Sequence, residues 1–218
     1  MIVARNEAGR YLSETLPPLV ALCDLVVLWD DGSDDDTARI AADLGCEVWR
    51  TEESYWERDE SVVREALYMK VLEHDPEWVL CLDADEMLEA PAMLLPLLDG
   101  DGPYRLPLLH CWGDRDTVRV DDWWGNCWTI RLYKPPRDPS FTPRPLHIGG
   151  APQAVMESPT VEAEARVLHF GYLRSEDIAS KLDRYKRLDP KGEWGSLDVY
   201  ASFNSPPMLA DRHGNPVP

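Results

Sequence analysis

The sequence has few basic residues. Its 22 Lys and Arg stand against 40 Asp and Glu, so the formal net charge is −18 at pH 7. Such a surface repels the phosphates of nucleic acids and the headgroups of anionic lipids. We therefore expect no duplex nucleic acid among the partners, unless the fold hides a local basic patch.

Long apolar runs are missing as well, and the first residues do not resemble a leader. No run reaches the length that crosses a membrane. Arg5 and Glu7 bring charge into the first ten residues, which does not fit a signal peptide. We expect a cytoplasmic protein without a transmembrane segment.

Cysteine is scarce, and its spacing excludes two common uses. The five cysteines are odd in number and widely separated, and three of them fall in apolar, strand-like runs. This pattern indicates buried thiols and not a disulfide framework or a zinc site. The residues are Cys23, Cys46, Cys81, Cys111 and Cys127.

What the first half does contain is an alternation of strand and helix. Residues 78–82 form a continuous apolar run, which predicts a strand buried on both faces. Pro17 and Pro18 predict a break or kink in the first helix. The alternation is typical of a doubly wound, mostly parallel sheet. Further strands are predicted at 1–4, 25–29 and 46–49, and helices at 11–22, 37–44 and 61–74.

The second half of the sequence differs in pattern from the first: its predicted strands are short, and it contains more proline. A helix with an apolar stripe is predicted from Ser175, and Gly and Pro dominate from Asp189 onward. We find no internal repeat and no linker, so 218 residues predict one α/β domain with a mobile tail from Pro206. Short strands are expected at 104–110, 128–133, 146–150 and 165–170, and a short helix at 91–98.

Polar clusters follow three of the predicted strands. They are residues 5–7, the pair Asp30 and Asp31, and residues 83–86. In open α/β sheets, ligands bind outside the carboxyl ends of the strands, so these clusters predict one site. Asp83 and Asp85 flank a small alanine and can approach a single point, where a divalent cation would neutralise them. Taken alone, these acids fit an exposed acidic turn equally well, and residues 34–36 fit helix capping better.

The motifs Arg5-Asn6-Glu7, Trp29-Asp30-Asp31-Gly32-Ser33 and Leu82-Asp83-Ala84-Asp85-Glu86 resemble the amino-terminal half of family-two glycosyltransferases of the GT-A fold. Residues 168–172 and 181–190 are similar to the carboxyl-terminal part of one branch of that family, and the resemblance covers roughly residues 1–190. It implies a single domain of residues 1–218 with a mostly parallel central sheet flanked by helices. A nucleotide-sugar half (1–100) would precede a smaller acceptor-side β region (101–190) with a C-terminal helix, and an extended tail (191–218).

The resemblance also implies roles for the polar clusters. Asp83 and Asp85 would bind Mn²⁺ or Mg²⁺ on the donor diphosphate, and a later histidine would complete the metal shell. His169 is the first candidate for this ligand and His147 the second; the alternative for each is a satisfied polar residue at a strand end. The nucleotide-sugar would be held by Arg5, Asn6, Glu7, Asp30, Asp31, Asp83 and Ala84.

An inverting transfer needs a carboxylate that takes a proton from the acceptor hydroxyl. The candidates lie in the loosely matching region, at Asp114, Asp116, Asp121 and Asp122. We favour Asp122 and then Asp121, because they precede Trp123 and Trp124, whose faces can stack on a sugar; His147 is a further acceptor candidate. The alternative is a solvated acidic loop over a tryptophan-rich core.

The expected function is therefore transfer of a hexose from a UDP- or GDP-sugar to a saccharide, protein or other hydroxyl-bearing acceptor. A nucleotidyltransferase on a similar fold would need a glycine-rich phosphate loop, and residues 5–9 are too poor in glycine. A transferase-like binding module without turnover is the other alternative. The intact acids at Asp83 and Asp85 argue against it.

Overall fold

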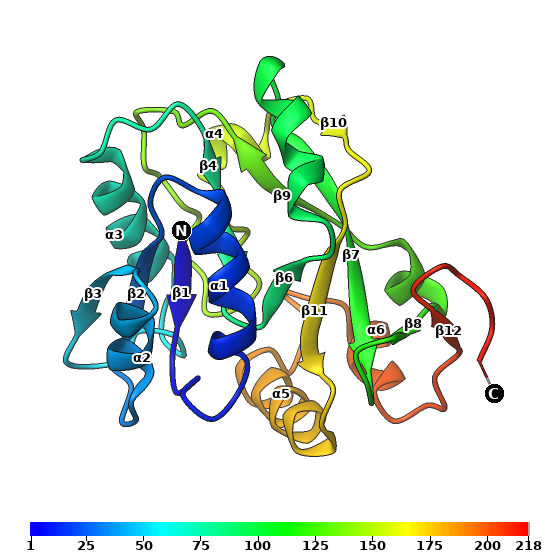
Figure 1. Ribbon diagram of the computed structural model, residues 1–218. Coiled ribbons are helices and arrows are strands. Elements are labelled where there is room, and N and C mark those ends of the chain that lie inside the picture. The colour runs from blue at the N-terminus through cyan, green and yellow to red at the C-terminus, as the bar shows by residue number, and fades with distance from the viewer. Residues whose placement is uncertain (218) are drawn as a thin grey trace.

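The computed structural model describes residues 1–217, and it confirms the predicted α/β class (Figure 1). Strands and helices alternate through the first eighty residues. Four strands form a wholly parallel sheet in the order β3-β2-β1-β5. Their bounds are β1 Ile2–Ala4, β2 Val27–Asp31, β3 Glu47–Thr51 and β5 Leu82–Asp83.

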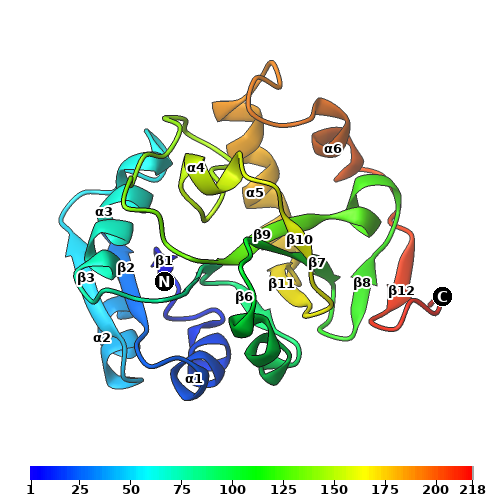
Figure 2. The same ribbon diagram turned by 90° about the horizontal axis from the view of Figure 1, so that it is seen from above.

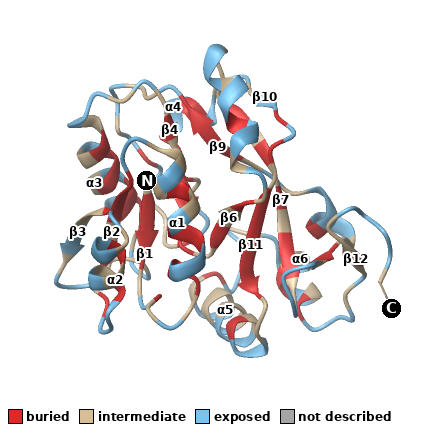
Figure 3. Cartoon of the chain, in the orientation of Figure 1, coloured by how far each residue is buried: buried red, intermediate tan, exposed pale blue. Residues whose placement is uncertain are grey.

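Helices cover both faces of this sheet. The helix α1 (Leu12–Leu22) packs its buried side chains with Ile2, Leu28 and Leu82 of one face, together with α2 (Thr37–Asp43). On the other face, α3 (Glu60–Leu72) packs against Val3 and Val27. Figure 3 colours the strands of this sheet mostly as buried (red) and the outward faces of its helices as exposed (pale blue). Alternate residues of one strand thus serve two cores, as expected for a sheet buried on both sides.

The predicted break at Pro17 and Pro18 is wrong, because α1 runs unbroken through both prolines. A proline in a helix removes one backbone hydrogen bond to the carbonyl four residues earlier. Those carbonyls belong to Ser13 and Glu14, which are exposed and can bind water. The opposite face of the helix is buried in the core and holds its path.

The predicted single strand at 78–82 is divided between two sheets. Residues Val79–Leu80 (β4) pair antiparallel with β9 (Trp128–Tyr133), whereas Leu82–Asp83 (β5) pairs parallel with β1. The chain crosses between the sheets at Cys81, whose thiol is fully buried. It then turns at Ala84 and Asp85 into β6 (Glu86–Leu88). The acidic motif therefore lies on the boundary of the two sheets.

The second sheet is mixed and follows the order β12-β8-β7-β11-β6, with β9 and β10 also paired to β7 (Figure 2). Its central strands are β7 (Tyr104–Trp112) and β11 (Val167–Tyr172), which run parallel. The strands predicted at 104–110, 128–133 and 165–170 are confirmed. The smaller elements are β8 Thr117–Arg119, β10 Val161–Glu162, β12 Leu209–Asp211, the 3-10 helices η1 Pro91–Asp99 and η2 Asp122–Asn126, and the helices α4 Gln153–Met156, α5 Ser175–Leu188 and α6 Leu197–Ser202.

Two expectations for the second half are corrected. Residues 146–150 do not form a strand, because His147 adopts a left-handed backbone with φ of 59°. The tail is not extended, since α6 packs Tyr200 and Phe203 inward and β12 pairs with β8. Among residues 1–217, no helix is both long and apolar enough to pass through a membrane.

Candidate functional site

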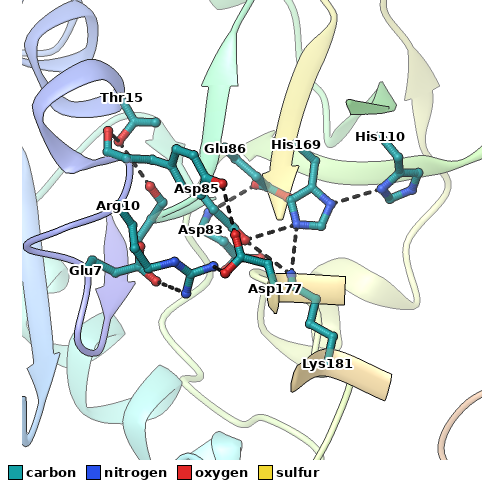
Figure 4. A network of polar contacts seen from close by, with 12 residues as sticks. Glu7, Arg10, Thr15, Asp83, Asp85, Glu86, His110, His169, Asp177 and Lys181 are labelled. Carbon is teal, nitrogen blue, oxygen red and sulfur yellow. Dashed lines mark hydrogen bonds and ion pairs between the residues drawn. The ribbon is translucent and has the colours of Figure 1, made fainter. Parts of the chain in front are cut away.

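A cavity of about 400 Å³ opens where the carboxyl ends of β1 and β5 meet β11 and α5. The first half contributes Arg5 and Glu7, the end of β5 contributes Asp83, and the turn after β5 contributes Asp85. The second half contributes His169 from β11 and Lys181 from α5 (Figure 4). Pockets of this size and mixed lining are typical of small-molecule sites.

The turn that carries the acids is fixed from both sides. Thr15 on α1 donates its hydroxyl to the carbonyl of Ala84 at 3.0 Å. The carboxylate of Glu86 accepts from the backbone N–H of Asp83 at 3.0 Å and from the guanidinium of Arg131. Burial raises the pKa of Glu86 despite the charge of Arg131. The two ends of the turn are thus tied to α1 and β9, which sets the directions of Asp83 and Asp85.

Asp83 is held by two arginines. Its Oδ1 accepts from Arg64 at 2.7 Å, and its Oδ2 lies 3.6 Å from Arg131. Burial opposes ionisation, but the two guanidinium groups outweigh it and lower the pKa of Asp83. Because Arg64 comes from α3 and Arg131 from β9, this carboxylate joins the two halves of the molecule.

Asp85 has different partners. Its Oδ2 lies 3.2 Å from Lys181 Nζ and 3.2 Å from His169 Nε2, and those two nitrogens are 3.3 Å apart. Burial again opposes ionisation, but Lys181 and His169 hold the pKa of Asp85 well below its usual range. The three atoms converge on one point, where positive charge is favoured.

Gly171 keeps space free at this point. A Cβ built there would lie 2.3 Å from Lys181 Nζ, 2.6 Å from Asp85 Oδ2 and 2.7 Å from His169 Nε2. The strand β11 also shifts its register with β7 between His169 and Tyr172. Any larger residue at position 171 would therefore displace the groups that meet here.

His110 also lines the cavity, although no motif in the sequence singles it out. Its Nδ1 lies 2.9 Å from Nδ1 of His169, and the residue is 2% exposed. Burial, then the neighbouring His169 and Lys181, lowers the pKa of His110 far below its usual range. Only the pairing of β7 with β11 places the two imidazoles together, at the register His169↔His110.

Glu7 and Arg10 form the opposite wall of the cavity. Glu7 Oε1 accepts from Arg10 at 2.9 Å, and Arg10 reaches Asp177 at 3.2 Å. Burial and then the charge of Asp85 raise the pKa of Glu7 to about 8. Among the described residues, the buried Oε2 of Glu7 has no hydrogen-bond partner. This oxygen is available to a ligand.

Three residues predicted to hold the nucleoside have internal partners instead of facing the cavity. Asn6 accepts from the backbone N–H of Asp34 at 2.9 Å. Asp30 is fully buried, accepts from the N–H of Ser33 at 3.0 Å and lies 3.3 Å from Arg50. Asp31 accepts from the hydroxyl of Ser54 at 2.6 Å and from two backbone N–H groups, those of Tyr55 at 3.0 Å and Trp56 at 2.9 Å.

The predicted catalytic acids Asp121 and Asp122 do not line the cavity. Asp121 accepts two hydrogen bonds from Arg119, at 2.8 and 2.7 Å. The Arg119 guanidinium itself lies over the rings of Trp112 and Trp124, at 4.7 and 4.8 Å from their centroids. Asp122 is exposed and begins η2 with φ of 46°.

The three acceptor candidates differ in exposure. Trp123 lines the cavity and is 44% exposed, whereas Trp124 is 2% exposed and donates Nε1–H to Ser202. His147 lines the cavity with its Nε2 2.7 Å from the Tyr200 hydroxyl. Of the predicted residues, the cavity brings together Arg5, Glu7, Asp83, Ala84, Asp85, Trp123, His147 and His169, and it leaves out Asn6, Asp30, Asp31, Asp121, Asp122 and Trp124.

Within residues 1–217, no three side chains of His, Cys, Asp or Glu come together as a group that could hold a metal ion. Asp85 Oδ2 and His169 Nε2 are the two candidate donors that face one point. Carboxylate suits both Mn²⁺ and Mg²⁺, and the imidazole would add one nitrogen ligand. A metal here would take its remaining ligands from a substrate and from water, which is usual for Mg²⁺ sites on phosphates.

No family model matches this chain. Two uncharacterized proteins, of Mycobacterium tuberculosis and Mycobacterium bovis, are each 27% identical over 208 residues, which is 85% of this chain and 49% of theirs. The chain therefore spans about half the length of the curated relatives it matches.

Solved structures give partial likenesses. S. aureus TarS matches 61% of this chain and 45% of its own, with 18% identity and a TM-score of 0.42. Glucosyl-3-phosphoglycerate synthase from M. tuberculosis, in complex with Mn²⁺, UDP and glucosyl-3-phosphoglycerate, matches 51% of this chain and 43% of its own, with 22% identity and a TM-score of 0.34. At these TM-scores we base the function on the residues of the site.

Proposed function

We propose that this chain is a metal-dependent glycosyltransferase of the GT-A type, which moves a sugar from a UDP- or GDP-sugar to a hydroxyl-bearing acceptor with inversion. The observation that carries the proposal is the convergence of Asp85, His169 and Lys181 on one point at the carboxyl edge of the parallel sheet. A nucleotide diphosphate needs a compact cluster of positive charge at such an edge.

The charge of the cavity supports a diphosphate ligand. The whole chain has a net charge of −18, yet the cavity lining has six Arg and Lys and six Asp and Glu. The cavity is thus formally balanced within an acidic protein, so it repels a diphosphate less than the chain's net charge alone would suggest. The basic residues are Arg5, Arg10, Arg64, Arg131, Lys181 and Arg184.

Asp85 and His169 would hold the Mn²⁺ or Mg²⁺ at the point where the Lys181 ammonium now contacts both of them. When bound, the metal supplies Lewis-acid stabilisation of the departing nucleoside diphosphate. Lys181 would yield its place beside Asp85 to the metal and serve as a charge-assisted donor to the diphosphate. Asp83 would contact the ribose while Arg64 and Arg131 hold its orientation.

The nucleoside would lie against Arg5 and Glu7. With a pKa of about 8, the Glu7 carboxyl carries a proton at neutral pH and can both donate to and accept from the edge of a base. Asn6, Asp30 and Asp31 would act by ordering the loops around this subsite. Asp31 binds the N–H of Trp56, and Trp56 lines the cavity.

The acceptor would lie on the side of Trp123 and His147, where aromatic faces can stack on a sugar ring. Two hydrogen bonds commit Asp121 to Arg119, so Asp122 is the proposed base and Asp121 a residue that fixes the loop. Trp124 would support this loop from the core through its bond to Ser202.

Donor binding is the direct test. Thermal unfolding is followed with UDP or GDP, each with Mn²⁺, Mg²⁺ or a chelator. At about 100 times its dissociation constant a ligand adds about 2.7 kcal/mol, a shift of several degrees for a chain of this size. We expect one diphosphate to give a metal-dependent shift, and release of that diphosphate from its sugar donor then shows turnover.

Asp85→Ala should abolish the metal-dependent part of the shift, because it removes one of the two proposed protein ligands. Asp43→Ala, on the exposed end of α2, is the matched control and should leave the shift unchanged. An equal shift with chelator, or a wild-type shift in Asp85→Ala, would show that the metal assignment is wrong. Binding without any turnover would favour a module that only binds.

A further inference from the structure

The buried pair His110 and His169 shares a single hydrogen bond between its rings. Their Nδ1 atoms face each other at 2.9 Å, and a hydrogen bond between two nitrogens needs one proton and one lone pair. Both residues are buried, at 2% and 9% exposure. One of the two Nδ1 atoms must therefore carry the proton of this bond, and the other must supply the lone pair.

This complementarity determines what His169 offers to the cavity. If the proton of His169 lies on Nδ1, its Nε2 presents a lone pair toward Asp85 and Lys181. If instead His110 donates from Nδ1, His169 carries its proton on Nε2 and donates it to Asp85. A metal ion at Nε2 requires the first arrangement, because a ligating nitrogen has no proton.

We propose that His110 is a positioning residue for His169: it accepts the Nδ1–H of His169 and so directs the Nε2 lone pair toward the metal. The inference rests on the proposed function for the metal, but the pairing of the two rings is a property of the protein alone. Partners of this kind fix the tautomer and orientation of ligating histidines, and their loss typically weakens metal binding 10- to 100-fold.

The surroundings of His110 hold its ring in place for this task. The rings of Trp123, Trp124 and Tyr172 lie 5.1–5.4 Å from it, centroid to centroid. Among the described residues, the buried Nε2 of His110 has no hydrogen-bond partner. Its one hydrogen bond is therefore the one to His169. A flip of the ring would break this bond and form no other.

The pairing is tested first without metal. Long-range ¹⁵N–¹H NMR of the chelated protein reports which nitrogen of each histidine carries the proton. We expect complementary tautomers, with one of the two Nδ1 atoms protonated. With Mg²⁺ and the diphosphate that stabilises the protein, His169 should carry its proton on Nδ1 and His110 on Nε2. Identical tautomers of the two rings in the chelated protein would overturn the inference.

The consequence for metal binding is tested by Mn²⁺ titration in the presence of the diphosphate, with free Mn²⁺ measured by electron paramagnetic resonance. His110→Leu should weaken Mn²⁺ binding 10- to 100-fold. His110→Asn, whose amide oxygen can replace the Nδ1 acceptor, should restore binding to within a few-fold of wild type. His110→Gln, whose longer side chain places its amide nearer the Nε2 position, should not.

Cys111→Ala is the control for damage to β7, since Cys111 is fully buried on the same strand and hydrogen-bonds to Arg115. It should lower stability and leave Mn²⁺ affinity unchanged. Wild-type affinity in a folded His110→Leu, or restoration by Gln but not by Asn, would overturn the inference. If the wild type shows complementary tautomers but binds no Mn²⁺, the proposed metal site fails and the pairing of the rings stands.

Discussion

Buried carboxylates are stabilised differently in the two parts of the molecule. In the first sheet, Asp30 and Asp31 end β2 and are bound largely by N–H and O–H groups of nearby loops. At the boundary of the two sheets, Asp83, Asp85 and Glu86 are bound mainly by cationic side chains from other elements. Loop amides stay in place whatever binds nearby, whereas a side-chain cation can be exchanged for a ligand cation.

Exposure separates the boundary cations further. The side chains of Arg64 and Arg131 are 4% and 6% exposed, whereas that of Lys181 is 23% exposed and reaches the cavity from α5. We infer that the arginines are structural and that Lys181 is the cation that can yield its place beside Asp85. We therefore expect the chemistry at Asp85, while Asp83 and Glu86 hold the turn that carries it in place.

The largest effect is expected at Arg131. Arg131→Met leaves Glu86 buried without its cation, and breaking a buried ion pair costs about 3–5 kcal/mol. Urea unfolding of the folded variant measures this loss. The double variant Arg131→Met with Glu86→Gln removes both charges and should recover part of it. A loss below about 1 kcal/mol in the single variant would show that Arg131 is dispensable, and the distinction from Lys181 would fail.

The sequence predicted the first sheet well for a physical reason. Its central strands are continuous apolar runs buried on both faces, and its helices have apolar faces of period 3.6, so local pattern and fold agree. The error at Pro17 and Pro18 arose because the pattern does not show which carbonyls reach water. The division of residues 78–82 was also invisible, because β4 and β5 are equally apolar and differ only in their partner strand.

The second half could not be predicted to the same depth. The contact of His110 with His169 joins residues 59 positions apart and depends on the register of β7 with β11. The site of Lys181 likewise depends on how α5 packs under β11. The sequence predicted Asp85 and His169 at the ends of strands. It could not show that Asp121 accepts hydrogen bonds from Arg119, or that residues of α6 line the cavity.

A smaller effect is expected where loop amides bind the acid. Asp31→Ala removes the acceptor for Ser54, Tyr55 and Trp56, and we expect a loss of about 2 kcal/mol, the scale of hydrogen bonds to a charged group. Because Trp56 lines the cavity, binding of free UDP or GDP should weaken, while its dependence on metal persists. Urea unfolding and calorimetry measure the two quantities. If binding of the nucleotide to Asp31→Ala no longer depended on metal, Asp31 would act like Asp85 at the sheet boundary, and the distinction between the two groups of acids would fail.

The smallest change in any single comparison is the change in stability per pH unit that we expect from Glu7. Folding raises the pKa of this carboxyl from 4.5 to about 8, mainly by burial, so the native state holds a proton that the unfolded chain has lost. Between these pH values stability falls as pH rises, by about 1.4 kcal/mol per pH unit for one proton. Glu7→Gln is neutral throughout and avoids this loss.

The free energy of unfolding of Glu7→Gln, relative to wild type, should therefore rise by about 1.4 kcal/mol per unit from pH 6 to pH 7 and level off above about pH 8. Glu57→Gln is the control: a hydrogen bond from Arg187 lowers the pKa of Glu57, so this carboxyl is ionised in both states and its difference should stay constant over that range. A constant difference for Glu7→Gln would mean that Glu7 is ionised in the folded protein. Its Oε2 would then be an acceptor only, and the nucleoside subsite would select a base edge that donates.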